Sequence, residues 1–191
     1  MMKIINIQKK RFDTIRTAAD NDRNVSIERT VAAILRKVEK EGDKAVRHYT
    51  AKFDGTRLRS LAVSQDEIAS ARKNADKKFV SIMRNSAENI RRFHTAQLRK
   101  PFSLSVDHRS YLRQIYNPIE RAGVYVPGGK AAYPSTVLMN VIPAQVAGVK
   151  EIHLVSPPDA EGNVHKDVLL AASLLGIKNV YRIGGAQAVA A

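Results

Sequence analysis

Two Gly-Gly turns in the last third of the chain are the residues best suited to hold a ligand. Gly128-Gly129 follows the β-prone run Ala122–Val126, and Gly184-Gly185 follows a second run of this kind. Glycine lets the backbone approach a ligand closely, and a helix that starts after such a turn offers unpaired N–H groups to a phosphate. The chemistry indicated is nucleotide binding. Neither turn spells G-x-G-x-x-G or a Walker sequence, so ordinary turns that end strands remain the alternative.

Side chains next to these turns could contact the same ligand. Tyr125 lies at the end of the first run, where its ring could pack on a planar ligand or simply pack within a sheet. Gln187 follows Gly185 at the start of a helix, and its amide can donate to and accept from a ligand hydroxyl, with an exposed surface position as the alternative. Pro127 and Lys130 flank the first turn, and Lys130 could face a phosphate or water.

Other kinds of chemistry lack support in the residues. The chain has no cysteine, which excludes disulfides and thiolate metal sites. No G-x-S-x-G sequence and no pair of carboxylates at a strand end indicates a catalytic centre. The five histidines show no metal-ligand spacing, so we expect structural roles for His48, His94, His108, His153 and His165.

The elements around the turns alternate between strand and helix after Pro118. The runs 122–126, 151–155 and 179–183 are β-prone, and 135–147 and 166–175 read as helices between them. Spacings of about 25 to 30 residues match successive βαβ units and predict a parallel sheet. Parallel strands end at one edge, so the loops at 127–129, 156–158 and 184–187 should form one ligand crevice. Pro143 should kink or divide the first helix.

Residues 1–117 are predicted to be mostly helical. Ser26 is expected to cap a helix that breaks at Gly42, and a short strand is possible at 58–63. Ser64 to Glu67 has the spacing of a capping box. The second helical region reaches about Gln97, and Asp76 is a candidate break within it.

The apolar residues of that second region include Ile82 and Phe93 and fall on one face. The helix stops by Pro101, and an irregular or strand-containing connection follows at 106–115. The sequence thus divides into a helical region, 1–117, and an α/β region, 118–191.

Composition bounds the class of protein. With 191 residues, 44% of them hydrophobic, the chain should be globular, and no run is long and apolar enough for a membrane span. The N-terminal apolar patch is too short for a signal peptide, which favours a cytoplasmic protein.

The net charge of +14 is uneven, since residues 1–116 hold 26 Lys and Arg against 13 Asp and Glu. A solvated helix surface explains such charge without a nucleic-acid motif, and polyanion binding is the alternative.

Longer segments of the sequence resemble the N-terminal part of histidinol dehydrogenase. The resemblance covers nearly the whole chain and is strongest in GVYVPGGKAAYPSTVLMNVIPAQVAGVKEIHLVSPP and YRIGGAQAVAA. Shorter matching segments are Val25-Ser26, Arg29-Thr30-Val31, Glu41 to Ala45, Lys52 to Gly55, Glu88-Asn89-Ile90 and Phe93 to Gln97.

The resemblance implies an enzyme that uses NAD and zinc. Such an enzyme oxidises L-histidinol through L-histidinaldehyde to L-histidine, the last steps of histidine biosynthesis, as a homodimer with NAD on an incomplete Rossmann-like domain. The family's NAD-contacting tyrosine and glutamine match Tyr125 and Gln187. Pro127, Gly128 and Gly129 would shape the same pocket.

The family's catalytic Glu-His pair and zinc ligands have no counterpart up to Ala191, so the resemblance assigns no catalytic or metal residue here. We therefore expect a fragment that is inactive alone and poorly stable or prone to aggregate. Two other hypotheses remain open, which are a stand-alone nucleotide-binding module and a basic nucleic-acid-binding protein on a degenerate enzyme scaffold.

Overall fold

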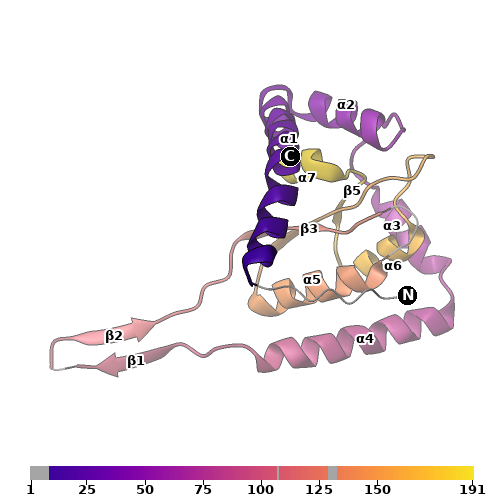
Figure 1. Cartoon of the computed structure of the whole chain (residues 1–191). Coiled ribbons are helices and arrows are strands. Elements are labelled where there is room, and N and C mark those ends of the chain that lie inside the picture. The colour runs from indigo at the N-terminus through magenta and orange to yellow at the C-terminus, as the bar shows by residue number, and fades with distance from the viewer. Residues whose placement is uncertain (1–8, 107, 129–132) are drawn as a thin grey trace.

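The computed structural model describes residues 9–106, 108–128 and 133–191, with side chains from residue 25 onward. Helices come first and a small parallel sheet follows (Figure 1), which confirms the predicted α/β class and the order of its parts. None of the described helices is long and apolar enough to cross a membrane.

The sheet holds three parallel strands in the order β3-β4-β5, which are β3 (Arg121–Tyr125), β4 (Glu151–Val155) and β5 (Asn179–Tyr181). The helices α5 (Pro134–Ala147) and α6 (Lys166–Leu174) connect them, as predicted. The strand expected at 58–63 is reduced to one antiparallel bridge, between Ala62 and Tyr181. Backbone hydrogen bonds of 2.8 Å from Val63 N to Val180 O and from Arg182 N to Leu61 O fix this segment beside β5.

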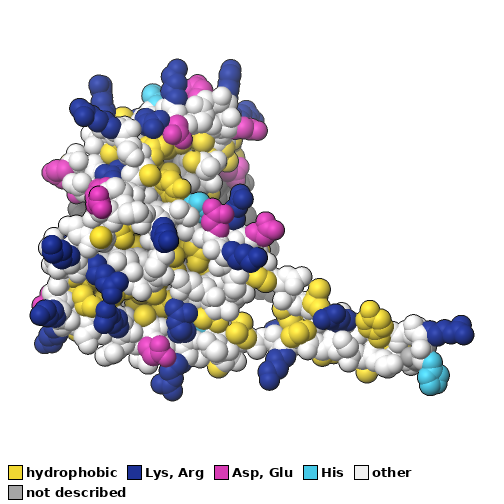
Figure 2. Space-filling model, turned by 180° about the vertical axis from the view of Figure 1, so that it is seen from behind, with side chains coloured by type: hydrophobic (Ala, Val, Ile, Leu, Met, Phe, Trp, Pro, Cys, Tyr) yellow, Lys and Arg dark blue, Asp and Glu magenta, His cyan; other side chains and the backbone are white. Residues whose placement is uncertain are grey.

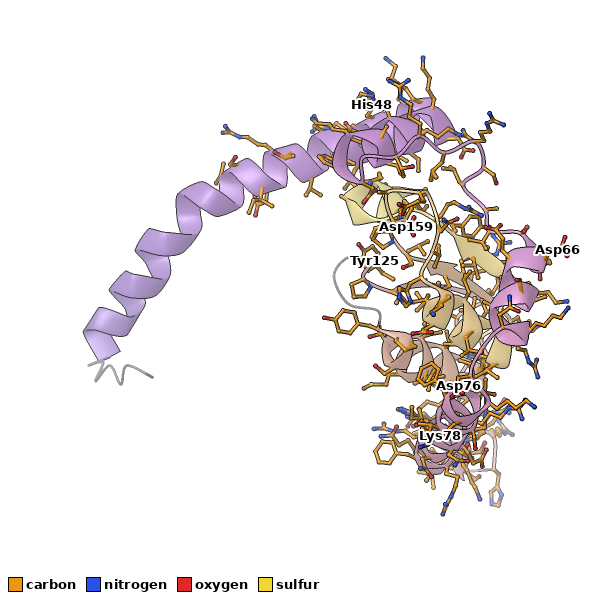
Figure 3. All side chains as sticks on the ribbon, turned by 90° about the vertical axis from the view of Figure 1, so that its right-hand side faces the viewer. His48, Asp66, Asp76, Lys78, Tyr125 and Asp159 are labelled. Atoms are coloured by element: carbon orange, nitrogen blue, oxygen red, sulfur yellow. The ribbon has the colours of Figure 1, made fainter. Side chains whose placement is uncertain are left out.

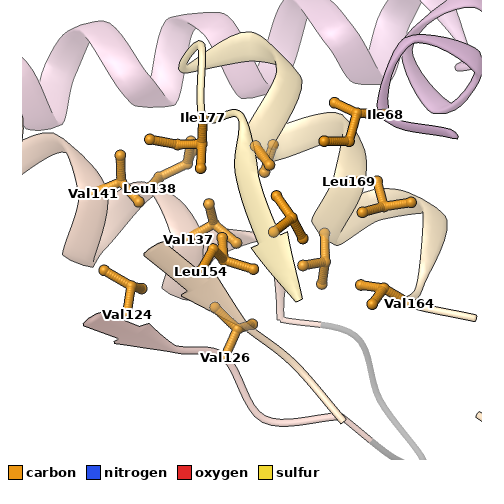
Figure 4. Packing of buried hydrophobic residues seen from close by; sticks show 14 of the residues in the cluster. Ile68, Val124, Val126, Val137, Leu138, Val141, Leu154, Val164, Leu169 and Ile177 are labelled. Carbon is orange, nitrogen blue, oxygen red and sulfur yellow. The ribbon is translucent and has the colours of Figure 1, made fainter. Parts of the chain in front are cut away.

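The larger core lies between one face of the sheet and α5 and α6 (Figure 4). Val124, Leu154 and Val180 point from the three strands into it, and Val137 and Val168 meet them from the helices. These runs are apolar because a parallel strand that is covered by helices loses contact with water. The helix α5 runs unbroken from its first residue to its last with Pro143 inside it, so the predicted division does not occur.

The first two helices form a second, smaller core on the opposite side of the sheet. The helix α1 (Lys9–Glu41) ends at Gly42, whose φ of 55° turns the chain into α2 (Asp43–Phe53). Both pack against α7 (Gly185–Ala190) through a cluster that includes Val38, Val46 and Ala188. The expected cap at Ser26 is wrong, because α1 continues through it and Thr30 Oγ1 donates to the Ser26 carbonyl at 2.9 Å.

The next two helices, α3 (Gln65–Lys73) and α4 (Lys77–Ala96), confirm the predicted capping box and the break at Asp76. Ser64 Oγ accepts from Glu67 N, and Asp76 caps α4 by accepting from Phe79 N at 2.8 Å. The predicted single apolar face of α4 is partly wrong. Ile82 and Phe93 are exposed, because the contact with α5 uses a narrower stripe around Met83.

The segment after α4 forms an antiparallel hairpin of β1 (Phe102–Ser105) and β2 (Tyr111–Gln114) that projects from the body (Figure 1). Leu104 pairs with Leu112, and these two side chains stay 56% and 61% exposed. An isolated two-stranded hairpin is marginally stable in water. This arm, residues 102–114, therefore presents apolar side chains that no described part of the chain covers.

Candidate functional site

The three loops that follow the parallel strands meet at one edge of the sheet, as the spacing predicted. Pro157, after β4, lies between Gly128, after β3, and Gly184, after β5. A Cβ on Gly128 would lie 2.9 Å from the Pro157 carbonyl oxygen, and one on Gly184 would lie 2.8 Å from Pro157 Cβ. Both positions therefore require glycine because the loops pack closely on each other. Pro127 is exposed beside them, whereas Gly129 and Lys130 lie outside the described residues.

Tyr125 and Gln187, the two side chains singled out from the sequence, lie close to the same turn. Gly185 N donates a hydrogen bond to Tyr125 Oη at 3.2 Å, which joins the end of β3 to the start of α7. Figure 3 shows Tyr125 below α7, on the side of the sheet where α1 runs. The Tyr125 side chain is 40% exposed, so its ring remains accessible from solvent.

Gln187 is buried, and its surface alternative is wrong. The residue is 1% exposed, and neither Nε2 nor Oε1 has a hydrogen-bond partner among the described residues. Its Oε1 lies 2.7 Å from the place where a Cβ on Gly185 would stand, and Gly185 has a φ of 64°. Another residue at position 185 would be strained at this φ and would press on the Gln187 amide, which favours glycine there. A buried amide without partners is unusual in a folded protein and marks a candidate recognition group.

A cleft of about 930 Å³ runs along the face of the sheet that α5 and α6 do not cover. The side chains of Arg121, Tyr125 and His153 line it from the strands, and Arg47 and Arg59 reach it from α2 and the segment before the bridge. Gly123 lies between Arg121 and Tyr125 on β3, and nothing comes within 4 Å of where its Cβ would be. This glycine thus opens the floor of the cleft beside the Tyr125 ring.

Sequence reasoning missed a row of polar side chains on this face of the sheet. Glu151 accepts from Arg121 Nε at 2.9 Å and pairs with His153 Nε2 at 2.8 Å. The His153 ring stacks on Tyr181 with 5.9 Å between ring centroids. A prediction of the register between the first two parallel strands would have found this row, because Arg121 lies directly opposite Glu151 across β3 and β4. The His153 side chain is 31% exposed on this face of the sheet.

A second ionic contact fixes the outer edge of β5. Arg182 Nη2 lies 2.7 and 2.8 Å from the two carboxylate oxygens of Glu67. Glu67 Oε2 also accepts from the backbone N–H and the hydroxyl of Ser64. Burial alone would raise the pKa of Glu67, but the hydrogen bonds from Ser64 and Arg182 outweigh it and hold that pKa below its ordinary value. This clamp ties α3 to the strand that leads into the Gly184 turn.

The described residues contain no group of three or more His, Cys, Asp or Glu side chains that could hold a metal ion. A zinc ion therefore has no set of ligands in the described part of this chain, and no chemical step is assigned to zinc here. The site that the geometry does build is a binding edge with an adjoining cleft.

The fold and this edge are typical of α/β proteins that bind a nucleotide where parallel strands end. The sequence profile of the histidinol dehydrogenase family matches residues 16–191. The chain belongs to the histidinol dehydrogenase family.

Several curated relatives carry the name histidinol dehydrogenase. The one from Chlorobaculum tepidum is 50% identical over 164 residues, which are 86% of this chain and 38% of its own length. The one from Bacillus subtilis is 47% identical over 163 residues, 85% of this chain and 38% of its own length. The one from Prochlorococcus marinus is 42% identical, and the match covers 100% of this chain and 44% of that relative's length. The chain thus spans about two fifths of the length of these relatives.

A solved structure agrees with the sequence matches. The crystal structure of histidinol dehydrogenase from Elizabethkingia anophelis superposes with a TM-score of 0.82 at 38% sequence identity. The match covers 86% of this chain and 38% of that one. The predicted family resemblance and fold are therefore both confirmed.

Proposed function

We propose that this chain supplies the NAD-binding part of a histidinol dehydrogenase. The whole enzyme would oxidise L-histidinol through L-histidinaldehyde to L-histidine and reduce NAD. One observation carries the proposal. Tyr125 and Gln187 come from opposite ends of the α/β region, and both lie at the Gly184-Gly185 turn. The same two positions match the NAD-contacting residues that the family resemblance implies.

Each group at the edge has a physical role in this proposal. The exposed ring of Tyr125 offers a flat surface to a planar base or nicotinamide. The amide of Gln187 gains partners from ligand hydroxyls and so removes the cost of its unpaired burial. The glycines at 128 and 184 let the loops close around Pro157, and we propose that Pro127, Gly128 and Gly129 shape the neighbouring wall of the pocket.

The remaining properties of the whole enzyme are proposals from family membership. They are zinc as the metal cofactor, L-histidinol as substrate, a homodimeric assembly and a cytoplasmic location. Catalytic residues and zinc ligands are not assigned to positions of this chain. The match covers 38% of the length of two of these relatives. Activity is therefore expected only when the remaining part of such an enzyme is also present.

Calorimetric titration of the 191-residue chain with NAD tests the binding proposal. We expect saturable binding that Gln187→Ala and Tyr125→Ala each weaken about tenfold or more, since each removes a contact buried by the ligand. Tyr111→Ala is the matched control, because Tyr111 lies on the arm, away from the edge. Absence of any heat at millimolar NAD, or equal losses in all three variants, would contradict the proposal.

The comparisons favour the enzyme family over a nucleic-acid-binding protein. Figure 2 shows Lys and Arg side chains spread over the visible face with acidic side chains among them, which is the pattern of a solvated surface. Polyanion binding would require affinity that falls steeply with salt. We expect no shift of DNA or RNA at physiological salt in a gel-mobility assay.

A further inference from the structure

The Gln187 carboxamide lies beside the Gly184-Gly185 turn without a hydrogen-bond partner among the described residues. The Gln187 carboxamide lies folded back behind Gly185, is fully buried, and has both of its polar atoms unpaired among the described residues. Folded proteins pair nearly all such groups, so an unpaired amide persists only where its surroundings hold it there.

Contacts with the two neighbouring loops hold this arrangement. The first is the hydrogen bond from Gly185 N to Tyr125 Oη at 3.2 Å, which ties the turn to the end of β3. The second is the packing of Gly184 against Pro157, which fixes the other side of the turn. Pro157 has no polar side chain that a ligand could displace. The Tyr125 hydroxyl is therefore the contact that can open.

Tyr125 also lies at the boundary between the cleft and the turn. Its ring lines the 930 Å³ cleft, whereas its hydroxyl bonds to Gly185. Tyr125 lines this cleft and Gln187 does not, so a planar ligand in the cleft can contact Tyr125 while the Gln187 amide is still buried. Movement of the ring toward such a ligand would break the bond to Gly185 and release the turn.

We propose that the Tyr125–Gly185 hydrogen bond is a latch that holds the turn closed in the ligand-free protein, with the Gln187 amide stored behind Gly185. A nucleotide opens the latch by drawing the Tyr125 ring onto its own surface, and the released amide then bonds the ligand. This inference rests on the proposed NAD site and adds its regulation. The Tyr125 hydroxyl opposes binding, whereas the Tyr125 ring supports it.

Tyr125→Phe separates these two effects, because it keeps the ring and removes the hydroxyl. Titration of the 191-residue chain with NAD should show binding about two- to tenfold tighter than the parent, the range that loss of one competing hydrogen bond allows. Tyr125→Ala, which lacks the ring as well, should bind more weakly than the parent. Tyr111→Phe, the same chemical change on the arm, should leave the affinity unchanged.

A second measurement reads the latch without any ligand. Amide hydrogen exchange at Gly185, followed by NMR, should be slower in the parent than in Tyr125→Phe, and equal in the parent and Tyr111→Phe. Gln187→Met fills the same space without the amide, so it should raise the urea midpoint of the free chain and weaken NAD binding at least tenfold. This pair of results would show that the amide is stored at a cost to stability.

The outcomes distinguish the latch from the function on which it rests. Equal or weaker NAD binding by Tyr125→Phe overturns the latch and leaves the NAD site standing. Equal exchange at Gly185 in the parent and Tyr125→Phe, or a lower urea midpoint for Gln187→Met, also overturns it. If neither the parent nor any variant binds NAD, the proposed function fails and the latch fails with it.

Discussion

Glu67→Gln removes the charge from the clamp that joins α3 to β5, and its effect can be estimated from the contacts. The Arg182 side chain is only 13% exposed, and it would keep a buried positive charge without a carboxylate partner. A charge-assisted hydrogen bond contributes about 1.5 to 3 kcal/mol, and the lower half applies because Glu67 is 40% exposed. We expect a loss of about 2 kcal/mol, or a fall of about 1 M in the urea midpoint.

The assay is urea unfolding followed by far-UV circular dichroism at low protein concentration, with Glu88→Gln as the matched control on the exposed side of α4. The folded-state pKa of Glu67 is held below its ordinary value of 4.5. The Glu67 carboxylate therefore contributes to the free energy of unfolding above that pH, and this contribution is lost as the pH falls through the folded-state pKa. The gap between the parent and Glu67→Gln should narrow below pH 4.5. Equal midpoints for Glu67→Gln and Glu88→Gln at pH 7, or a gap that does not change with pH, would refute this reasoning.

Four further variants test other parts of the structure. Gly184→Ala should lower the free energy of unfolding by about 1 to 3 kcal/mol because its methyl group would strike Pro157, whereas Gly123→Ala, in open space, should change it by less than about 0.5 kcal/mol. Leu104→Asp should reduce self-association measured by light scattering, because it puts a charge on the exposed apolar arm. An unchanged scattering signal would argue against the arm as the surface through which the chain self-associates. Burial raises the pKa of Asp54, so Asp54→Asn should raise the urea midpoint at pH 7 but not at pH 3, and a lower midpoint at pH 7 would contradict this.

The parallel sheet and the meeting of the three loops could be predicted from the sequence because they depend on local signals. Short apolar runs and the glycines and prolines that end them mark each βαβ unit, and parallel pairing then places the ends of the strands together. The capping box at Ser64 and the break at Asp76 were predictable for the same reason, since each cap involves neighbours in the chain.

The features that were missed depend on contacts between distant segments. The cleft lies between the sheet and residues of α2 and α7, and no periodicity within a single helix reveals that contact. Burial of Gln187 has the same origin. Ile82 and Phe93 are exposed because only a narrow stripe of α4 contacts α5. Helical spacing alone does not predict the width of that stripe. Ser26 is compatible with a cap, but the residues before it continue the helix.

The most direct test of the central claim is an NMR titration of the isotope-labelled chain with NAD. If the edge binds the nucleotide, the amide signals of Tyr125, Gly128 and residues 184–187 should shift and saturate together, while those of the arm at 102–114 stay in place. Unchanged signals at the edge in millimolar NAD, or shifts confined to the arm or to α4, would contradict the account.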